Sequence, residues 1–81
     1  MTAPSTLNDF RPAADICRER GWTPGTQIVG DEGYGPTVIE ITALGERTML
    51  AKAVSINGAP PSYGDERTWA LHCRDWREVR S

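Results

Sequence analysis

The sequence lacks long apolar runs, blocks of like charge and a rich supply of cysteine. No stretch approaches the ~18 to 20 apolar residues of a membrane-spanning helix, so no contact with membranes is expected. Cys17 and Cys73 are the only cysteines, and no apolar segment of the kind found in secretion signals is seen. We therefore expect a cytoplasmic protein with two ordinary thiols and no disulfide.

Metal-binding and catalytic patterns are also missing. Cys17, His72 and Cys73 lack the paired spacing of zinc ligands, and the sequence predicts neither a metal site nor a cofactor. Ser55, His72 and Asp75 have no spacing that would bring them together as a catalytic triad. We expect a protein that is not an enzyme.

The charge is nearly balanced, with nine Lys and Arg against eleven Asp and Glu. A strong nucleic-acid binder would show a basic stripe or a high pI, and neither is present. Eight of the nine basic residues are nevertheless Arg, and four of these fall within residues 67–81. Nucleic-acid binding therefore stays open as the less favoured alternative.

What the chain does contain indicates a small β-rich domain over residues 1–81. At this length, folding buries only about 60 to 65% of the surface of the unfolded chain, which argues against a deep active-site cavity. Eight Gly and six Pro predict many turns and short elements. We expect the β-rich part to span residues 25–79.

The N-terminal part predicts one helix. Residues 1–6 are small and polar, and we expect them to be disordered. A helix is predicted over 9–20, capped by Asn8 or Asp9 and ended by Gly21. The spacing predicts a buried stripe of small and apolar side chains: Phe10, Ala13, Ala14 and Cys17.

A β-hairpin is the strongest prediction. The β-branched run 36–44 is followed by an apolar run over 46–56, and Gly45 at the first position between them suits a type II′ turn. That turn pairs Ile41 with Leu50 and gives a core face of Ile39, Ile41, Leu50 and Val54. The opposite face would hold Val38, Leu44, Met49, Ala51 and Ala53. This face is too apolar to be fully wet, and the N-terminal helix or a partner should cover it.

Shorter strands are expected at 26–29, at 67–73 and around Glu78. Four or five short strands joined by one tight turn and two long loops favour a small SH3-like barrel with one N-terminal helix. The alternative is an open antiparallel sheet with the helix packed on one face.

The loop "GDEGYG", residues 30–35, raises the question of a phosphate site. Phosphate loops lead into a helix N-terminus, whereas this loop leads into a strand and carries Asp31 and Glu32. We therefore interpret it as a wide turn whose glycines adopt positive φ angles. Tyr34 could still contact a partner there.

Two stretches, "GTQIVGDEGYGPTVIEITALGE" and "WALHCRDWREV", resemble small uncharacterised proteins of tailed bacteriophages and prophages, across roughly residues 20 to 79. The resemblance implies an accessory protein acting inside an infected bacterium. It implies no catalytic residues.

Aromatic and arginine side chains suggest how such a protein would work, because these residue types anchor protein interfaces. We expect Trp69 to lie in the core and the rings in turn-rich segments to line an exposed groove. The predicted function is non-catalytic binding of a host or phage protein by a monomer or weak dimer. The candidate partner-binding residues are Trp22, Asp31, Glu32, Tyr34, Tyr63, Arg74, Trp76 and Arg77.

Overall fold

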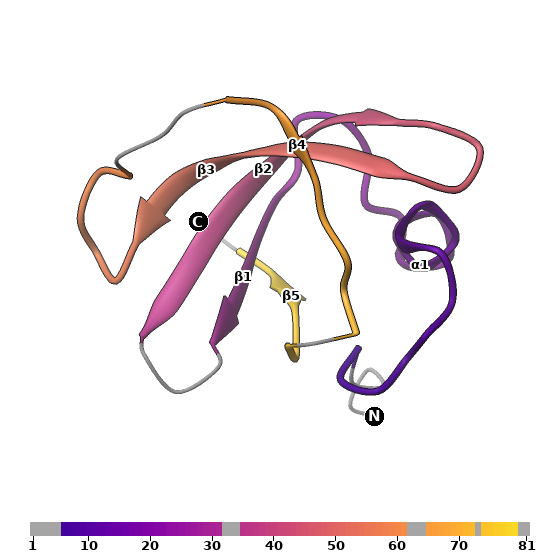
Figure 1. Cartoon of the computed structure of the whole chain (residues 1–81), viewed down its shortest axis with the longest axis horizontal. Helices are drawn as coiled ribbons and strands as arrows, with labels where there is room; N and C mark the ends of the chain where they lie inside the picture. Colours follow the sequence, from indigo (N-terminus) through magenta and orange to yellow (C-terminus); the bar gives the residue numbers. More distant parts are fainter. Residues whose placement is uncertain (1–5, 32–34, 62–64, 73, 80–81) are drawn as a thin grey trace.

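The computed structural model describes residues 6–31, 35–61, 65–72 and 74–79 (Figure 1). Within these residues, one helix is followed by five strands: α1 (Ala13–Arg20), β1 (Gln27–Asp31), β2 (Pro36–Leu44), β3 (Met49–Ile56), β4 (Arg67–Thr68) and β5 (Arg77–Glu78). The strands form one antiparallel sheet in the order β4-β3-β2-β1-β5. The prediction of a mainly β fold with an N-terminal helix is confirmed.

The sheet is open, so the predicted SH3-like barrel is not confirmed and the open-sheet alternative describes the fold. In the part of the chain that the structure describes, β4 and β5 are the two edges and do not pair with each other. Each pairs with its neighbour over only two residues. The residue that follows β4 and the residue that precedes β5 are in contact instead, since the rings of Trp69 and Trp76 form an edge-to-face contact with centroids 6.0 Å apart.

The hairpin between β2 and β3 closes with a longer loop than predicted. Residues 45–48 form the loop, and the Gly45 N–H donates to the Thr48 carbonyl at 2.8 Å. Gly45 does not have the positive φ that a type II′ turn requires. Ile41 consequently pairs with Ala51, one residue beyond its predicted partner, and the predicted register was wrong.

This one-residue slip exchanges the faces of β3. The buried inner face of the hairpin consists of Ile39, Ile41, Met49, Ala51 and Ala53. Leu50 is only half-buried and Val54 is exposed, although both were predicted to lie in the core. The inner face is covered by α1, because the Cys17 Sγ lies 3.6 Å from the Met49 Sδ.

Helix α1 begins at Ala13, later than predicted, and has no side-chain cap. The Pro12 carbonyl accepts the first helical hydrogen bonds. Asn8 and Asp9 were predicted as caps, but the Asp9 carboxylate accepts hydrogen bonds from Arg11 instead. No helix in the described ranges has the length and apolar character needed to cross a membrane.

The buried face of α1 is formed by Ala13, Ala14, Ile16 and Cys17. Phe10 was predicted to belong to this face but is 74% exposed, because it precedes the helix. The helix ends at Gly21 with a left-handed φ of 75°, as predicted. The first turn of α1 is fixed to the hairpin loop, since the Ala14 N–H donates to the Arg47 carbonyl at 3.2 Å.

Of the described residues in the strand predicted over 67–73, only Arg67 and Thr68 pair with β3, and they form β4. Beyond Thr68 the chain leaves the edge and crosses the sheet toward β5 (Figure 1). Trp69 stays partly buried against the core and its indole N–H donates to the Ala51 carbonyl at 3.1 Å. Leu71 is fully buried. This crossing segment closes the core on the side that the sheet leaves open.

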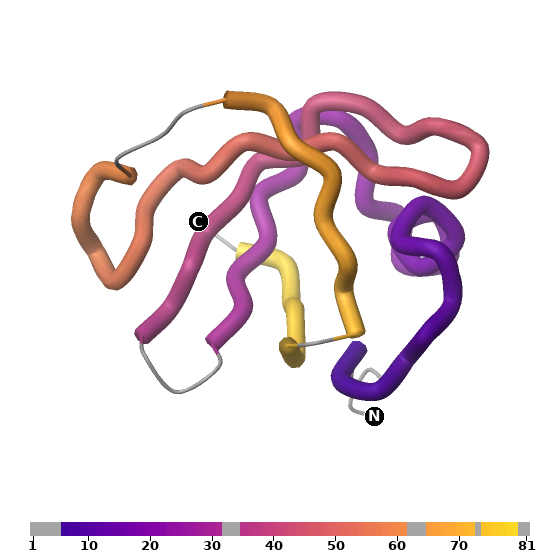
Figure 2. Tube along the Cα trace, in the orientation of Figure 1, coloured from indigo at the N-terminus to yellow at the C-terminus, as the bar shows by residue number. Residues whose placement is uncertain are grey.

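Residues 6–10, which we call the strap, lie beside the segment that leads into β5 (Figure 2). Thr6 is fully buried, so the prediction of disorder over residues 1–6 was wrong at this position, and the rest of that range lies outside the described residues. The Thr6 hydroxyl donates to the Arg74 carbonyl at 2.5 Å and accepts from the Trp76 N–H at 2.8 Å. These two hydrogen bonds explain why a small polar residue is buried.

Candidate binding surface along strands β1 and β5

The tryptophans at two predicted partner-binding positions are not available to a partner. Trp22 is 4% exposed and Trp76 is 1% exposed, so their assignment to an open groove was wrong. Both rings pack in the core, and each is also contacted by an arginine. The guanidinium carbon of Arg20 lies 5.3 Å from the Trp22 ring centroid, and that of Arg74 lies 5.4 Å from the Trp76 centroid. These large apolar rings are buried in the core even though they lie in turn-rich segments of the sequence.

Two other predicted residues are brought together at the surface. Asp31, at the end of β1, and Arg77, in β5, line one open hollow of about 440 Å³ with Val29 and Asp75. An Arg77 guanidinium nitrogen lies 3.6 Å from an Asp75 carboxylate oxygen. The hollow therefore offers both signs of charge beside an apolar side chain.

A second hollow of about 570 Å³ lies at the other end of β5, between residues 23–27 and residues 78–79. Its wall is a tight turn in which the Thr26 N–H donates to the Thr23 carbonyl at 2.9 Å. The Val79 N–H donates to the Gln27 carbonyl at 2.9 Å and fixes the other wall. Val79 is one of the large apolar residues that remain exposed. We call both hollows together with β5 the β1–β5 surface.

The alternation of β1 determines which side chains reach this surface. Ile28 and Gly30 face the core, whereas Gln27, Val29 and Asp31 lie on the opposite side. Gly30 is required by close approach, because a Cβ at this position would lie 2.8 Å from the ring of Trp76. This result corrects part of the loop interpretation, since Gly30 does not have a positive φ.

The outer edge of β5 also belongs to the β1–β5 surface. In an antiparallel pair, the main-chain groups of successive residues point alternately toward and away from the partner strand. The Val79 N–H points to β1, so the main-chain groups of Glu78 point away from it. Among the described strands, β5 pairs with β1 alone. An edge of this kind can pair with another extended segment.

Four other positions were predicted to bind a partner. Glu32, Tyr34 and Tyr63 lie outside the described residues. The guanidinium of Arg74 lies over the Trp76 ring.

Several lining residues were missed by the sequence argument. The strict alternation of β1 could have indicated Gln27 and Val29, and the turn signal at residues 24–25 could have indicated the wall of the second hollow. Nothing local to the sequence indicates that Asp75 and Asp31 line the same hollow.

The chemistry of the β1–β5 surface suits recognition. Its lining combines hydroxyl, amide, carboxylate, guanidinium and apolar groups that can hold a polypeptide. Within the described ranges, no group of three His, Cys, Asp or Glu side chains is arranged to hold a metal ion. The thiol of Cys17 is buried against Met49 in the core, and this burial raises its pKa to about 11.

The fold and surface together define a small domain with an open antiparallel sheet and one covering helix. Residues 11–81 match the family described as Domain of unknown function (DUF7241), and the chain belongs to this family. The match begins immediately after the strap. No curated protein and no solved structure shows a significant match to the chain.

Proposed function

We propose that this protein is a non-catalytic protein-binding module that recognises its partner through the β1–β5 surface. The observation that carries the proposal is the exposed edge of β5 between two hollows. An open strand edge binds an extended segment through main-chain hydrogen bonds, while adjacent hollows select its side chains. Val79 and Arg77 supply an apolar and a charged contact at this edge.

The distribution of charge and aromatic rings supports a protein partner over a nucleic acid. Proteins that hold single-stranded nucleic acid combine a cationic groove with exposed rings on which bases stack. Here Trp22 and Trp76 are buried, and Arg77 lies beside Asp31 and Asp75. Such mixed charge suits a polypeptide that itself carries both signs.

The biological setting belongs to the same proposal. The resemblance to phage and prophage proteins suggests a host or phage protein in the bacterial cytoplasm as the partner. An accessory protein of this kind acts by occupying a surface of its target, which requires no active site.

The first prediction tests the β1–β5 surface with a matched pair of variants. Arg77→Gln removes a charge from the edge strand β5, whereas Lys52→Gln removes an exposed charge from β3, which β2 separates from β1. Tagged full-length proteins would be used to capture partners from bacterial lysate, with quantification by mass spectrometry. We expect recovery of the specific partner to fall about tenfold with Arg77→Gln, as for loss of an interface anchor, and to stay unchanged with Lys52→Gln.

Equal recovery with both variants would contradict the assignment of the surface. Salt-sensitive retention of the wild-type protein on heparin, lost with Arg77→Gln, would favour the nucleic-acid alternative instead.

A further inference from the structure

The strap is a tight turn beside the segment that leads into β5, because the Asp9 N–H donates to the Thr6 carbonyl at 2.9 Å and Asn8 has a left-handed φ of 66°. In β5, alternation directs the main-chain groups of odd-numbered residues to β1 and those of even-numbered residues outward. The strap contacts main-chain groups of His72, Arg74 and Trp76, which precede β5. Trp76 comes directly before Arg77, so the contact of Thr6 lies at the start of the edge that Glu78 continues.

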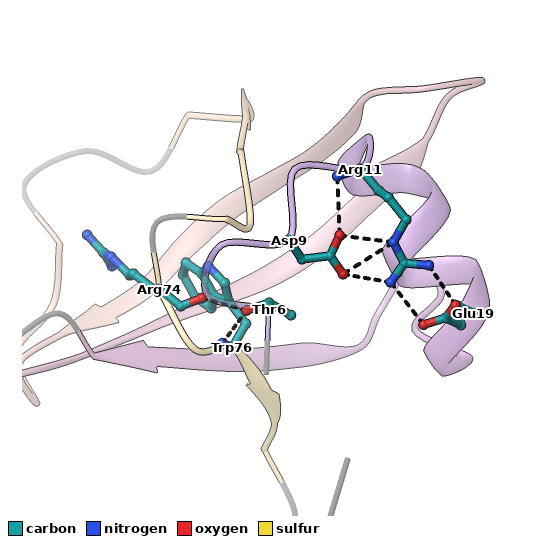
Figure 3. Close-up of polar contacts among 6 residues, drawn as sticks. All are labelled: Thr6, Asp9, Arg11, Glu19, Arg74 and Trp76. Atoms are coloured by element: carbon teal, nitrogen blue, oxygen red, sulfur yellow. Dashed lines mark hydrogen bonds and ion pairs between the residues drawn. The ribbon is translucent and has the colours of Figure 1, made fainter. Parts of the chain in front are cut away.

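The strap uses a side chain where a strand would use its backbone. One oxygen, the Thr6 hydroxyl, bridges the Arg74 carbonyl and the Trp76 N–H (Figure 3). A hydroxyl can donate and accept hydrogen bonds at a single atom. The slot between these two main-chain groups thus selects Ser or Thr over Val, which has the shape of Thr without its hydroxyl.

Little apolar burial holds the strap in this slot. Leu7 is 50% exposed and Phe10 is 74% exposed, although both are large apolar residues. In the middle of the strap the Asn8 N–H donates to the His72 carbonyl at 2.9 Å, and the exposed Phe10 ring contacts the His72 ring with centroids 4.9 Å apart. A segment with few buried apolar contacts and a high ordering cost opens before the rest of a domain.

The base of the strap is fastened separately. The guanidinium of Arg11 binds the carboxylates of Asp9 and Glu19, with shortest distances of 2.6 Å to each (Figure 3). This contact joins the strap to α1 at the point where the family match begins. Residues 6–8 can therefore leave the slot while the base stays attached.

We propose that the strap is an internal plug and that the slot beneath it binds a partner segment with Ser or Thr at the place of Thr6. This inference rests on the proposed binding function and specifies its ligand class. The incoming segment exchanges with the strap and continues along the edge of Glu78 into the β1–β5 surface. The strap competes with the partner segment for the slot. The apparent affinity for the partner segment is therefore its intrinsic affinity multiplied by the fraction of molecules in which the slot is empty.

The test uses a fluorescein-labelled peptide of residues 4–11, "PSTLNDFR", as the probe for full-length protein. Fluorescence anisotropy would compare the wild type with Thr6→Val and Thr6→Ser. We expect Thr6→Val to bind the peptide about tenfold more tightly than the wild type, because its own strap no longer fills the slot. Thr6→Ser should match the wild type, and a peptide carrying Thr6→Val should not bind.

A second variant guards against misfolding of Thr6→Val, whose loss of two buried hydrogen bonds could unfold the domain. Arg11→Gln changes an exposed side chain and releases the base of the strap while keeping the hydroxyl. It should bind the peptide about threefold more tightly than the wild type. Faster hydrogen exchange of the Trp76 amide should accompany this gain.

Peptide binding that is equal in the wild type and in both variants, or that does not require the peptide hydroxyl, would overturn the proposal. The assay needs no natural partner. Its failure would therefore leave the effect of Arg77→Gln on partner recovery intact, and the two proposals can fail separately.

Discussion

Helix α1 and the strap are adjacent in the sequence but are held by different forces. α1 buries Ile16 and Cys17 completely and packs on the inner face of the sheet at Met49. The strap leaves Leu7 and Phe10 exposed and is held by hydrogen bonds, ion pairs and a ring contact between Phe10 and His72. Apolar burial gives a permanent contact, whereas polar contacts at a strand edge can be exchanged for equivalent ones at little cost.

The titratable groups of the two regions reflect the same difference. Burial beneath α1 raises the pKa of the Cys17 thiol to about 11, so this thiol is neutral and unreactive at physiological pH. In the strap, hydrogen bonds from Arg11 lower the pKa of Asp9 to about 2. The raised pKa of Cys17 reflects burial in an apolar core, whereas the lowered pKa of Asp9 reflects a solvent-exposed ion pair.

The largest expected effect lies on the α1 side and tests the register of the hairpin. Ala51→Asp places an unpaired charge in the core and should cost more than about 3 kcal/mol, which is enough to unfold a small domain. Lys52→Asp, on the exposed side of the same strand, should cost less than about 1 kcal/mol. Urea denaturation followed by circular dichroism measures both. Comparable losses would reject the observed assignment of faces.

The next effect tests the junction of the two regions, where Trp76 is contacted by both β1 and the strap. Gly30→Ala would place a Cβ 2.8 Å from the Trp76 ring and should cost about 1 to 3 kcal/mol. Gly45→Ala is the control, because its Cβ would lie 3.2 Å from Thr48 in an exposed loop that can adjust. Thermal denaturation and tryptophan fluorescence would compare the variants. An unchanged melting temperature for Gly30→Ala would show that the ring can move aside.

Local patterns predicted the elements of the fold better than their pairing. The β-branched run of β2 and the end of α1 at Gly21 follow from nearest-neighbour chemistry, and both were correct. The register of the hairpin depends on the four-residue loop 45–48, which the sequence does not distinguish from a two-residue turn. Because of the longer loop, Ala51 lies in the core and Val54 is exposed, which is the reverse of the prediction.

The strap and the buried tryptophans could not be predicted because their contacts are distant in the sequence. Thr6 bonds to main-chain groups 68 and 70 residues away. Trp76 packs against Gly30, and nothing near either residue indicates the other. In the candidate site, the charges of Asp31 and Arg77 were predicted individually, and only the pairing of β1 with β5 placed them in one hollow.

The smallest expected effect lies at the base of the strap and depends on pH. Hydrogen bonds from Arg11 hold the pKa of Asp9 at about 2, below its ordinary value of 3.8. Ionised Asp9 therefore stabilises the closed strap, with the full effect present above about pH 4 and lost as the pH falls toward 2. The pKa of Glu19 is also lowered by its hydrogen bond from Arg11, so protonation of Glu19 in acid weakens the second contact as well.

NMR titration of the Asn8 and Trp76 amide signals from pH 7 to pH 2 would follow this opening. Asp9→Asn keeps a hydrogen-bond acceptor but removes the titrating charge, so the acid-dependent change should shrink to the part that Glu19 supplies. The α1 side provides the internal control, because the amide of Cys17 should keep its signal until the whole domain unfolds. If the Asn8 and Cys17 signals instead changed together at one pH, the strap and α1 would form a single cooperative unit, and the strap could not exchange independently of the core.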